Sequence, residues 1–324
     1  SDSWLAHAKT YCGMIAGRLG LGPESLVVEL ASNDGYLLQY MKEMGIPILG
    51  IDPSHTVAEA AETKGVPTIV DFFGTRLADK LAGEGRMADL ILGNNVLAHV
   101  PDVNDFVAGM ARLLKPAGTV TMEFPHVVRL VEGLQFDTIY HEHFSYFSFH
   151  TAERIFAAQG LVLYDVEEIP THGGSLRIYA RHAAHAALAV TGRVHELKAR
   201  EVAGGYDRPE GFDGFEAKVR KAKRDLLRFL IERREAGETV AGYGAPAKGN
   251  TLLNYCGVGI DLLDFTVDRN PMKQGRFLPG VRIPVLAPDA ITEAKPDYVL
   301  ILPWNLRDEV MGQLYIQVLR PLCW

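Results

Sequence analysis

The chain has 324 residues, which is enough for two domains that each bury a hydrophobic core. Hydrophobic residues make up 48% of it and charged residues 23%, as in an ordinary soluble globular protein, and no apolar run approaches the roughly 20 residues of a membrane span. The net charge of −7 argues against a general nucleic-acid binder, because a phosphate backbone attracts clustered Lys and Arg.

Short apolar strands alternate with amphipathic helices from about residue 25 onward. We predict strands at residues 25–30, 48–51, 68–70, 88–92 and 118–123, with helices at 35–44, 56–64 and 103–114 between them. This alternation is typical of a parallel, doubly wound α/β sheet. Two later strands, 161–168 and 175–181, are joined by a turn-rich segment and are expected to form an antiparallel hairpin that closes the sheet.

A second strand-helix series follows a long charged stretch. We predict strands at residues 239–243, 262–268 and 298–302 and a helix at 247–255. The predicted domains are therefore a first domain at 1–185, a helical linker at 186–237 and a smaller α/β domain at 238–324.

The segment VVELASNDG, residues 27–35, is the most informative stretch of the first half. A buried strand leads into small residues and then into a helix start, where free N–H groups favour a carboxylate or phosphate. It is not the GxGxxG fingerprint, and its single glycine leaves little room for a pyrophosphate. An acid at the strand end suits a cofactor with ammonium and sulfonium charges. The predicted cofactor is S-adenosylmethionine (SAM), with contacts from Glu29, Ala31, Asn33 and Gly35.

Three more polar stretches follow the ends of the next strands. Asp52 can accept both ribose hydroxyls, as the equivalent acid also does in NAD sites, and Asp71 with Phe72 can bracket an adenine. Each has a structural alternative, since Asp52 could cap a helix before Pro53, and Phe72 and Phe73 could be core. Ligands of open α/β sheets bind beyond the carboxyl ends of the strands, so all these residues are expected to share one site. The other predicted cofactor contacts are Pro53, Asn94, Asn95 and His99.

The segment FDTIYHEHFSYFS, residues 136–148, admits three interpretations. His141, Glu142 and His143 could bind a metal, but alternate residues of a strand point to opposite sides, and a further ligand would have to come from elsewhere. The segment could be a purely structural cluster. It could also perform acid–base catalysis, because histidine exchanges protons near neutral pH.

Collinear segments between residues 27 and 307 resemble the sugar C-methyltransferases that act on nucleotide-linked deoxyhexoses. The resemblance implies a SAM-dependent methyltransferase sheet of class I plus a second, smaller Rossmann-like α/β domain. It also implies methyl transfer to the carbon beside the ketone of a dTDP-4-keto-deoxysugar. The matching segments are residues 29–35, 94–102, 123–125, 140–146, 172–177 (HGGSLR), 242–250 (GYGAPAKGN) and 302–305 (LPWN).

The family's catalytic tyrosine, acid and histidine correspond to Tyr140, Glu142 and His143. A carbon beside a carbonyl becomes nucleophilic only after it loses a proton, so we predict that His143 is the base. Tyr140 would stabilise the enolate, and Glu142 would bind a sugar hydroxyl or orient His143.

The second domain is expected to help to hold the nucleotide sugar. Residues 242–249 read as a strand, a small-residue turn and a helix start with a lysine, which suits a diphosphate, although the spacing is not that of a P-loop. A close-packed turn is the alternative interpretation. The predicted substrate contacts are His172, Arg177, Tyr243, Lys248 and Asn250.

Members of this family usually begin with a small zinc domain that carries cysteine knuckles, and no such knuckles occur in this sequence. Either that domain lies outside the given sequence or the chain belongs to a branch without it. Cys12, Cys256 and Cys323 lie far apart and form neither a knuckle nor a disulfide framework, and residues 1–10 lack the pattern of a secretion signal. We therefore expect a protein of the reducing cytoplasm without a bound metal. Residues 315–324 also lack the Gly-rich final strand that the resemblance implies.

Three other functions compete with this interpretation. The first is methyl transfer to an oxygen or nitrogen of another small metabolite. The second is a nicotinamide-dependent oxidoreductase, which the two dinucleotide-like units favour, although GxGxxG is absent at both 30–35 and 243–249. The third is a sugar-nucleotide binding protein without catalysis.

Overall fold

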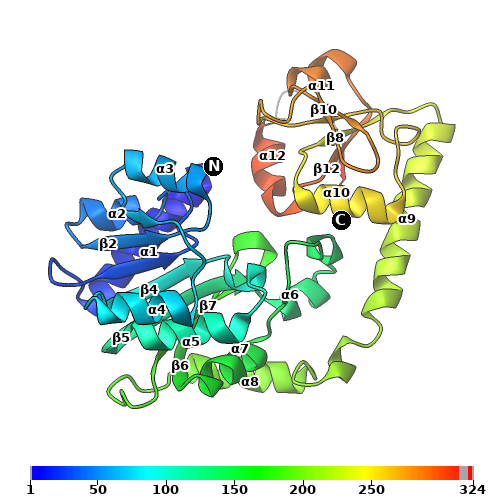
Figure 1. Cartoon of the computed structure of the whole chain (residues 1–324). Helices are drawn as coiled ribbons and strands as arrows, with labels where there is room; N and C mark the ends of the chain where they lie inside the picture. Colours follow the sequence, from blue (N-terminus) through cyan, green and yellow to red (C-terminus); the bar gives the residue numbers. More distant parts are fainter. Residues whose placement is uncertain (1, 314–319, 323–324) are drawn as a thin grey trace. The chain divides into compact units, whose positions relative to one another are not determined.

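The computed structural model describes residues 2–313 and 320–322, and these fall into two compact units (Figure 1). The first unit comprises Ser1–Val128, Glu142–Pro170 and Gly174–Gly211. The second comprises Arg129–His141, Thr171–Gly173 and Phe212–Trp324. The chain therefore passes between the units several times before its C-terminal part completes the second one.

The first unit is built on a sheet with the strand order β3-β2-β1-β4-β5-β7-β6. β1 to β5 are parallel, and β7 pairs antiparallel with both β5 and β6. The predicted parallel sheet and its closing hairpin are confirmed. The strands are β1 (Val27–Leu30), β2 (Ile48–Ile51), β3 (Thr68–Ile69), β4 (Ala88–Asn94), β5 (Leu114–Pro125), β6 (Leu161–Ile169) and β7 (Ser175–His182).

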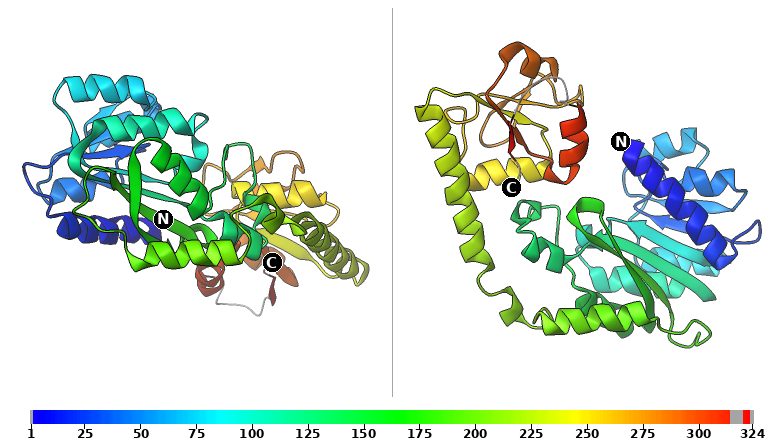
Figure 2. Two further views of the ribbon diagram at one scale, coloured as in Figure 1. Left: turned by 90° about the horizontal axis from the view of Figure 1, so that it is seen from below. Right: turned by 180° about the vertical axis from the view of Figure 1, so that it is seen from behind.

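Helices cover both faces of this sheet, as the view of Figure 1 and the view from behind in Figure 2 show. One face packs against α4, α5, α7 and α8, and the other against α1 and α2. The helices of the first unit are α1 (Asp2–Leu19), α2 (Leu38–Glu43), α3 (His55–Thr63), α4 (Thr75–Gly83), α5 (Val103–Leu113), α7 (Phe149–Ala158) and α8 (Gly192–Ala203), with the short 3₁₀ turn η1 (Leu97–His99). Helix α6 (Val127–Glu132) and the 3₁₀ turn η4 (Pro209–Phe212) lie where the chain leaves this unit, and the 3₁₀ turns η2 (Phe136–Thr138) and η3 (Thr171–Gly173) belong to the second unit.

Helix α1 was not among the predicted elements. It buries Ala8, Tyr11, Cys12 and Ile15 against the sheet, at the three- and four-residue spacing of one helical face. Small and polar-tipped residues such as Ala, Tyr and Cys make this stripe a weak hydrophobic signal, which explains the omission.

The second unit contains a mostly parallel sheet with the order β10-β11-β9-β8-β12-β13. β8 and β9 are parallel neighbours joined through α10, as in a Rossmann-like unit. The short strands β10, β11 and β13 were not predicted. The elements are β8 (Val240–Tyr243), β9 (Thr266–Val267), β10 (Arg276–Phe277), β11 (Pro284–Leu286), β12 (Tyr298–Ile301), β13 (Arg320–Leu322), α9 (Phe215–Glu235), α10 (Ala247–Cys256), α11 (Asp289–Ala294), α12 (Arg307–Gln313) and η5 (Trp304–Leu306).

The structure divides the predicted linker, residues 186–237, between the two units. Val194 and Leu197 of α8 belong to the core of the first unit, whereas Leu226 and Leu230 of α9 belong to the core of the second. Both helices are therefore integral to their units, and the predicted domain boundaries are corrected accordingly.

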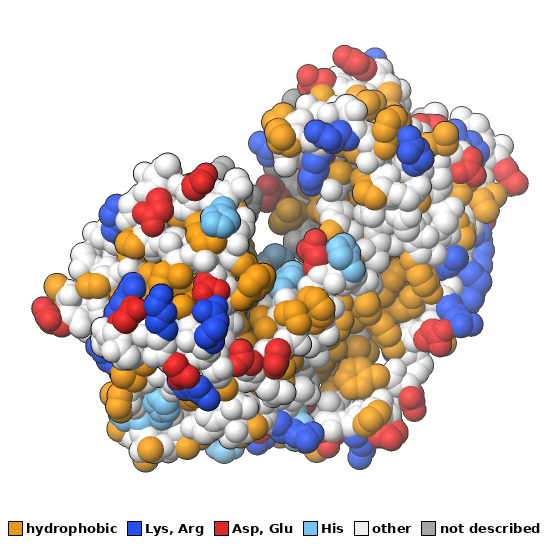
Figure 3. Space-filling view, in the orientation of Figure 1, with side chains coloured by type: hydrophobic (Ala, Val, Ile, Leu, Met, Phe, Trp, Pro, Cys, Tyr) orange, Lys and Arg blue, Asp and Glu red, His pale blue; other side chains and the backbone are white. Residues whose placement is uncertain are grey.

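Some sequence-based expectations fall partly on the chain's C-terminal end. Of the segment 315–324, residues 315–319 and 323–324 lie outside the described residues, and so does Cys323. Cys12 and Cys256 are buried free thiols. No helix within 2–313 and 320–322 is long and apolar enough to cross a membrane. On the visible face of the first unit, acidic and basic side chains are interspersed (Figure 3).

Candidate active site

The loop after β1 contains three residues with positive φ angles, a conformation that residues other than glycine rarely adopt. Ala31 and Asn33 have φ angles of 55° and 51°, and Gly35 has a φ of 71°. A Cβ atom at Gly35 would lie 2.9 Å from Val66 Cγ2, so glycine is required there both for conformation and for space. The Asn33 N–H is already used, because it donates to Asp52 Oδ2 at 3.0 Å. This loop thus fixes the ends of β1 and β2 to each other.

Glu29, the second-last residue of β1, is a buried acid whose side chain is incompletely hydrogen-bonded within the described residues. It is 1% exposed, and its Oε2 atom has no hydrogen-bond partner among the described residues. Burial raises the pKa of Glu29, and the charges of Asp34 and Asp52 raise it further. A cationic ligand group would supply the missing partner and oppose these effects. The ammonium of SAM therefore fits this position.

Asp52 lies at the end of β2 with its carboxylate held in a fixed orientation. Its Oδ2 accepts the Asn33 N–H, and its Oδ1 accepts the Ser54 N–H at 2.9 Å. The second of these bonds supports the turn that leads to α3, but the N-cap of α3 is Ser54, so Asp52 itself does not cap the helix. Each carboxylate oxygen keeps a further lone pair, which a ribose hydroxyl can use. Pro53 follows as an exposed residue at the same strand end.

We expect Asp52→Ala to weaken SAM binding by about 10- to 100-fold, because hydrogen bonds to a carboxylate are lost. Calorimetric titration with S-adenosylhomocysteine measures this, since that product binds without turnover. Asp79→Ala, which removes an exposed acid on α4, is the matched control. An unchanged dissociation constant for Asp52→Ala would contradict the ribose assignment.

The two adjacent phenylalanines after β3 have different environments. Phe72 is 78% exposed, whereas Phe73 packs edge-to-face on Phe106 with ring centroids 5.5 Å apart. The core interpretation thus holds for Phe73 alone, and Phe72 offers a free aromatic face. The carboxylate of Asp71 pairs with Arg76 Nη2 at 2.6 Å, and this hydrogen bond lowers the pKa of Asp71.

The end of β4 contributes a buried amide and an exposed histidine. Asn94 Nδ2 is buried and has no hydrogen-bond partner in the described part of the chain. Asn95 has a φ of 58°, and its N–H donates to Glu123 O at 2.8 Å. His99, in η1, is exposed.

The histidine-rich segment is attached to this strand end. The Phe144 N–H donates to Ala98 O at 2.8 Å. The ring of His143 meets that of His99 at 4.8 Å between centroids, and that of Tyr146 at 5.7 Å. His143 is half-buried.

The three predicted catalytic residues differ in their surroundings. Glu142 and His143 belong to the first unit, and Tyr140 belongs to the segment assigned to the second. His141 and Glu142 are exposed. The described residues contain no group of three His, Cys, Asp or Glu side chains arranged to hold a metal ion.

A buried hydrogen-bonded carboxyl group at the base of this segment was not predicted. Glu201 of α8 accepts hydrogen bonds from His126 Nε2 and the Phe149 N–H, both at 2.7 Å, and from the His150 N–H at 2.9 Å. His126 also forms an isolated bridge with Phe147. Glu201 therefore joins His126, shortly before the chain leaves the first unit, to Phe149 and His150, shortly after it has returned. Its place in a charged helix gave no sign of this role.

Arg177 is not available to a substrate. It is 6% exposed, donates to Glu123 Oε1 from Nε at 2.7 Å, and donates to Glu167 Oε2 from Nη1 at 2.9 Å. Its guanidinium also lies 4.6 Å from the ring centroid of Tyr11. Two carboxylates already neutralise its charge inside the sheet, so the prediction that Arg177 contacts the substrate is corrected.

Lys248, in the second unit, lies among groups that the sequence analysis did not single out. Its Nζ donates to Asn305 Oδ1 at 2.7 Å and lies 4.5 Å from the ring centroid of Trp304. Trp304 Nε1–H donates to Asp137 Oδ2 at 2.8 Å. Burial lowers the pKa of Lys248, against the opposing charge of Asp137.

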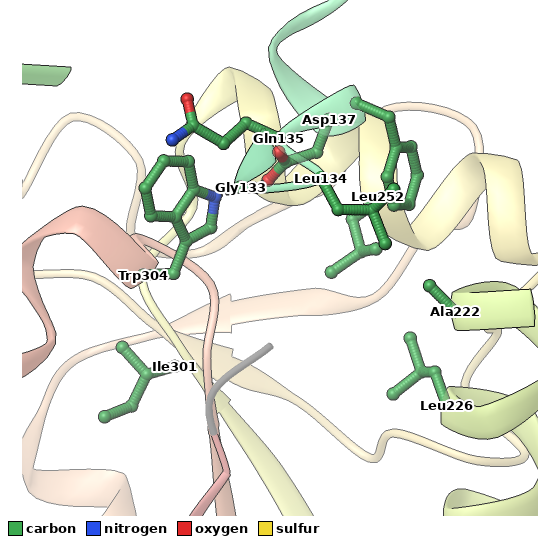
Figure 4. A pocket seen from close by; sticks show the side chains of 10 residues that line it. Gly133, Leu134, Gln135, Asp137, Ala222, Leu226, Leu252, Ile301 and Trp304 are labelled. Carbon is green, nitrogen blue, oxygen red and sulfur yellow. Dashed lines mark hydrogen bonds between the residues drawn. The ribbon is translucent and has the colours of Figure 1, made fainter. Parts of the chain in front are cut away.

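Asp137 and Trp304 line a pocket of the second unit (Figure 4). Gln135 lies beside them and donates to Gly173 O at 2.7 Å. The other walls are mainly apolar, and they include Leu226, Leu252, Phe136 and Ile301. The pocket therefore combines an aromatic ring, an acid and an amide with an apolar floor.

The remaining predicted substrate contacts lie in the second unit. Tyr243 ends β8 and is buried, which raises the pKa of its hydroxyl. His172 lies in η3 with a φ of 54°. Asn250, in the first turns of α10, accepts from Asn254 Nδ2 at 3.2 Å. The Ala245 N–H, in the turn before α10, is occupied by Asp268 Oδ2 at 2.7 Å, so this turn is partly structural.

Comparison with known proteins gives matches along both halves of the chain. Residues 7–166 match the family described as "Methyltransferase domain", and residues 170–318 match the "C-methyltransferase C-terminal domain". The chain is 37% identical over 314 residues to C-methyltransferase NovU of Streptomyces niveus, covering 96% of this chain and 74% of that protein.

Other similarities are shorter or weaker. A ubiquinone biosynthesis O-methyltransferase of Bartonella tribocorum is 31% identical over 93 residues, which is 28% of this chain and 38% of that protein. The crystal structure of the PH0226 protein from Pyrococcus horikoshii OT3 superposes with a TM-score of 0.47 and 16% identity, covering 56% of this chain and 92% of that one. The extended match to NovU and the two family matches show that this chain belongs to the family of SAM-dependent C-methyltransferases.

Proposed function

We propose that this C-methyltransferase methylates the carbon beside the ketone of a dTDP-linked 4-keto-deoxysugar, with His143 as the base. The observation that carries the proposal is the position of His143. The segment that contains it is hydrogen-bonded to Ala98, shortly after β4, on the edge of the sheet where Glu29, Asp52 and Asn94 lie at or next to the ends of their strands. The collinear resemblance to sugar C-methyltransferases supports the acceptor.

We assign each part of the methyl donor to different residues at this edge of the sheet. Glu29 would bind its ammonium, Asp52 its ribose, and Phe72 with Asp71 its adenine, while the loop through Ala31, Asn33 and Gly35 passes close to it. Pro53, Asn95 and His99 complete this edge. SAM supplies a methyl group on a sulfonium, and the sulfonium leaves as a neutral thioether when a carbon attacks.

His143 would take the proton from the substrate carbon onto an imidazole nitrogen. The electron pair of the broken C–H bond passes into the enolate and then forms the new C–C bond to the methyl group. Tyr140 would donate a hydrogen bond to the enolate oxygen, and Glu142 would bind a sugar hydroxyl or orient His143. The chemistry thus requires one proton acceptor and one hydrogen-bond donor from the protein.

We assign recognition of the nucleotide to the second unit. Trp304 and the apolar walls suit a nucleobase, and Lys248 is a cation beside them. His172, Tyr243 and Asn250 are the other proposed contacts, from three different segments of this unit. The acid Asp137 next to Lys248 reduces the local positive charge, so a base or a sugar fits this pocket better than a bare diphosphate does.

The test of this function is the position of the new methyl group. Incubation with a dTDP-4-keto-deoxyhexose and SAM labelled with ¹³C in its methyl group should give a product whose NMR spectrum shows a C–CH₃ group. In D₂O with S-adenosylhomocysteine in place of SAM, the substrate should exchange the proton beside its ketone. An O–CH₃ or N–CH₃ resonance, or the absence of exchange, would contradict the proposed chemistry.

A further inference from the structure

We infer that His7, together with Asn94, binds the carboxylate at the amino-acid end of SAM. His7 belongs to α1, and neither the sequence analysis nor the comparisons assign it a role. The inference rests on SAM as the methyl donor and does not depend on which acceptor is methylated.

His7 is oriented by a buried acid at the end of β5. Its Nε2 lies 3.0 Å from Glu123 Oε2, and the two side chains are 21% and 2% exposed. Burial alone would raise the pKa of Glu123, but the hydrogen bond to His7 and the charge of Arg177 hold that pKa below its ordinary value. An ionised Glu123 can only accept, so Nε2 of His7 carries a proton. Nδ1, on the other side of the ring, can donate to a ligand carboxylate when the ring is protonated, because both nitrogens of an imidazolium carry an N–H.

Glu123 brings His7 to the proposed donor site through the sheet register. Glu123 pairs with Asn94, and two residues earlier on β4 Leu92 pairs with Glu29. Side chains alternate along a strand, so Asn94 shares a face with Leu92, which packs in the core cluster formed with α1. Glu29 lies on this same face, two residues after Val27 of that cluster.

Two unsatisfied polar atoms on this face are complementary to an amino acid. Glu29 Oε2 is an acceptor that lacks a donor, and Asn94 Nδ2 is a donor that lacks an acceptor within the described ranges. Buried groups of this kind are rare in folded proteins unless a ligand or water satisfies them. An ammonium satisfies the first and a carboxylate satisfies the second.

Two aromatic residues, Trp4 and Tyr36, lie in the region of His7 and Glu29. Trp4 stacks on His7 with ring centroids 5.3 Å apart and lies 6.1 Å from the ring of Tyr36. Burial raises the pKa of Tyr36, and the charges of Glu29 and Glu123 raise it further, so the Tyr36 hydroxyl lies near both acids.

The charges at this edge explain why a ligand carboxylate needs His7. Glu29, Asp34, Asp52 and Glu123 make the edge acidic. Arg177 is paired with Glu123 and Glu167, and Lys64 is paired with Asp34 at 2.7 Å. In its protonated form, paired with Glu123 through Nε2, His7 offers a second N–H donor at Nδ1 and a positive charge, next to the amide of Asn94.

The test compares SAM with decarboxylated SAM, which lacks only the carboxylate, by calorimetry without an acceptor. In the unmodified protein, SAM should bind at least about tenfold more tightly than decarboxylated SAM. His7→Gln keeps an N–H near the position of Nε2 for Glu123 but loses Nδ1. It should weaken SAM binding by about tenfold and leave binding of decarboxylated SAM unchanged within about twofold.

His195→Ala, at an exposed position of α8, is the control and should affect neither ligand. The inference is overturned if the unmodified protein does not distinguish the two ligands, or if His7→Gln weakens both equally or neither. The first of these outcomes needs no variant and therefore holds even if His7→Gln does not fold. None of these outcomes decides which atom of the acceptor is methylated, because the NMR experiment tests that separately.

Discussion

His143→Ala is expected to lower kcat by about 10²- to 10⁴-fold, because the substrate carbon then lacks its proton acceptor. The affinity for S-adenosylhomocysteine should change by less than about twofold, since none of the strand-end groups that hold the donor is altered. Proton exchange beside the ketone in D₂O should stop as well. Single-turnover kinetics, calorimetry and NMR measure these three quantities on the same preparation.

The matched control for this variant is His141→Ala, two residues earlier and exposed. It removes an imidazole from the same segment and should retain activity within about threefold. Near-normal exchange in His143→Ala would show that the base is another group. His99, whose ring lies 4.8 Å from that of His143, would then be the next residue to replace.

The second large effect concerns stability. Glu201→Ala should lower the free energy of unfolding of the first unit by about 3–5 kcal/mol, because three buried donors lose their hydrogen-bond acceptor at once. The variant leaves His126 and the N–H groups of Phe149 and His150 without their acceptor. Because the chain forms two units, more than one unfolding transition is possible, and hydrogen exchange should be measured along with urea denaturation.

Glu196→Ala, an exposed acid on the same helix, should change this free energy by no more than about 0.5 kcal/mol. Glu201→Gln retains one acceptor oxygen and should fall between the two. A loss below about 1 kcal/mol in Glu201→Ala would mean that water or a rearranged neighbour satisfies these groups, and that Glu201 does not join these parts of the chain.

The repeating pattern of apolar residues was sufficient to predict most of the first unit. Strand β2 and helices α3 and α5 lie within one residue of their predicted ranges, because buried strands and amphipathic helices leave local periodic signals. The rule that ligands bind beyond the carboxyl ends of parallel strands also placed Glu29, Asp52 and Asn94 at one edge. These element ranges and this strand-end site could be predicted because they depend only on residues that are close in sequence and on the topology of a common type of sheet.

The surroundings of Arg177 and Glu201 could not be predicted, because both residues pair with residues that are distant in sequence. Arg177 looked like a free cation because nothing local shows that Glu123, 54 positions earlier, neutralises it. Glu201 looked like a surface acid, although its partner His126 is 75 residues away. His7 was overlooked because α1 has a weak hydrophobic pattern. The nicotinamide oxidoreductase alternative failed as well, since the matched families are methyltransferases.

The repeated passage of the chain between its units constrains how the protein can be synthesised and recombined. Phe136 and Asp137 are translated long before Tyr255 and Trp304, which they contact in the second unit. In a nascent chain, residues 129–141 therefore lack these partners until Trp304, 167 residues after Asp137, has been translated. For the same reason, a chimaera made with a single crossover after residue 211 would inherit this tryptophan and its aspartate from different parents, and those two parents would have to match.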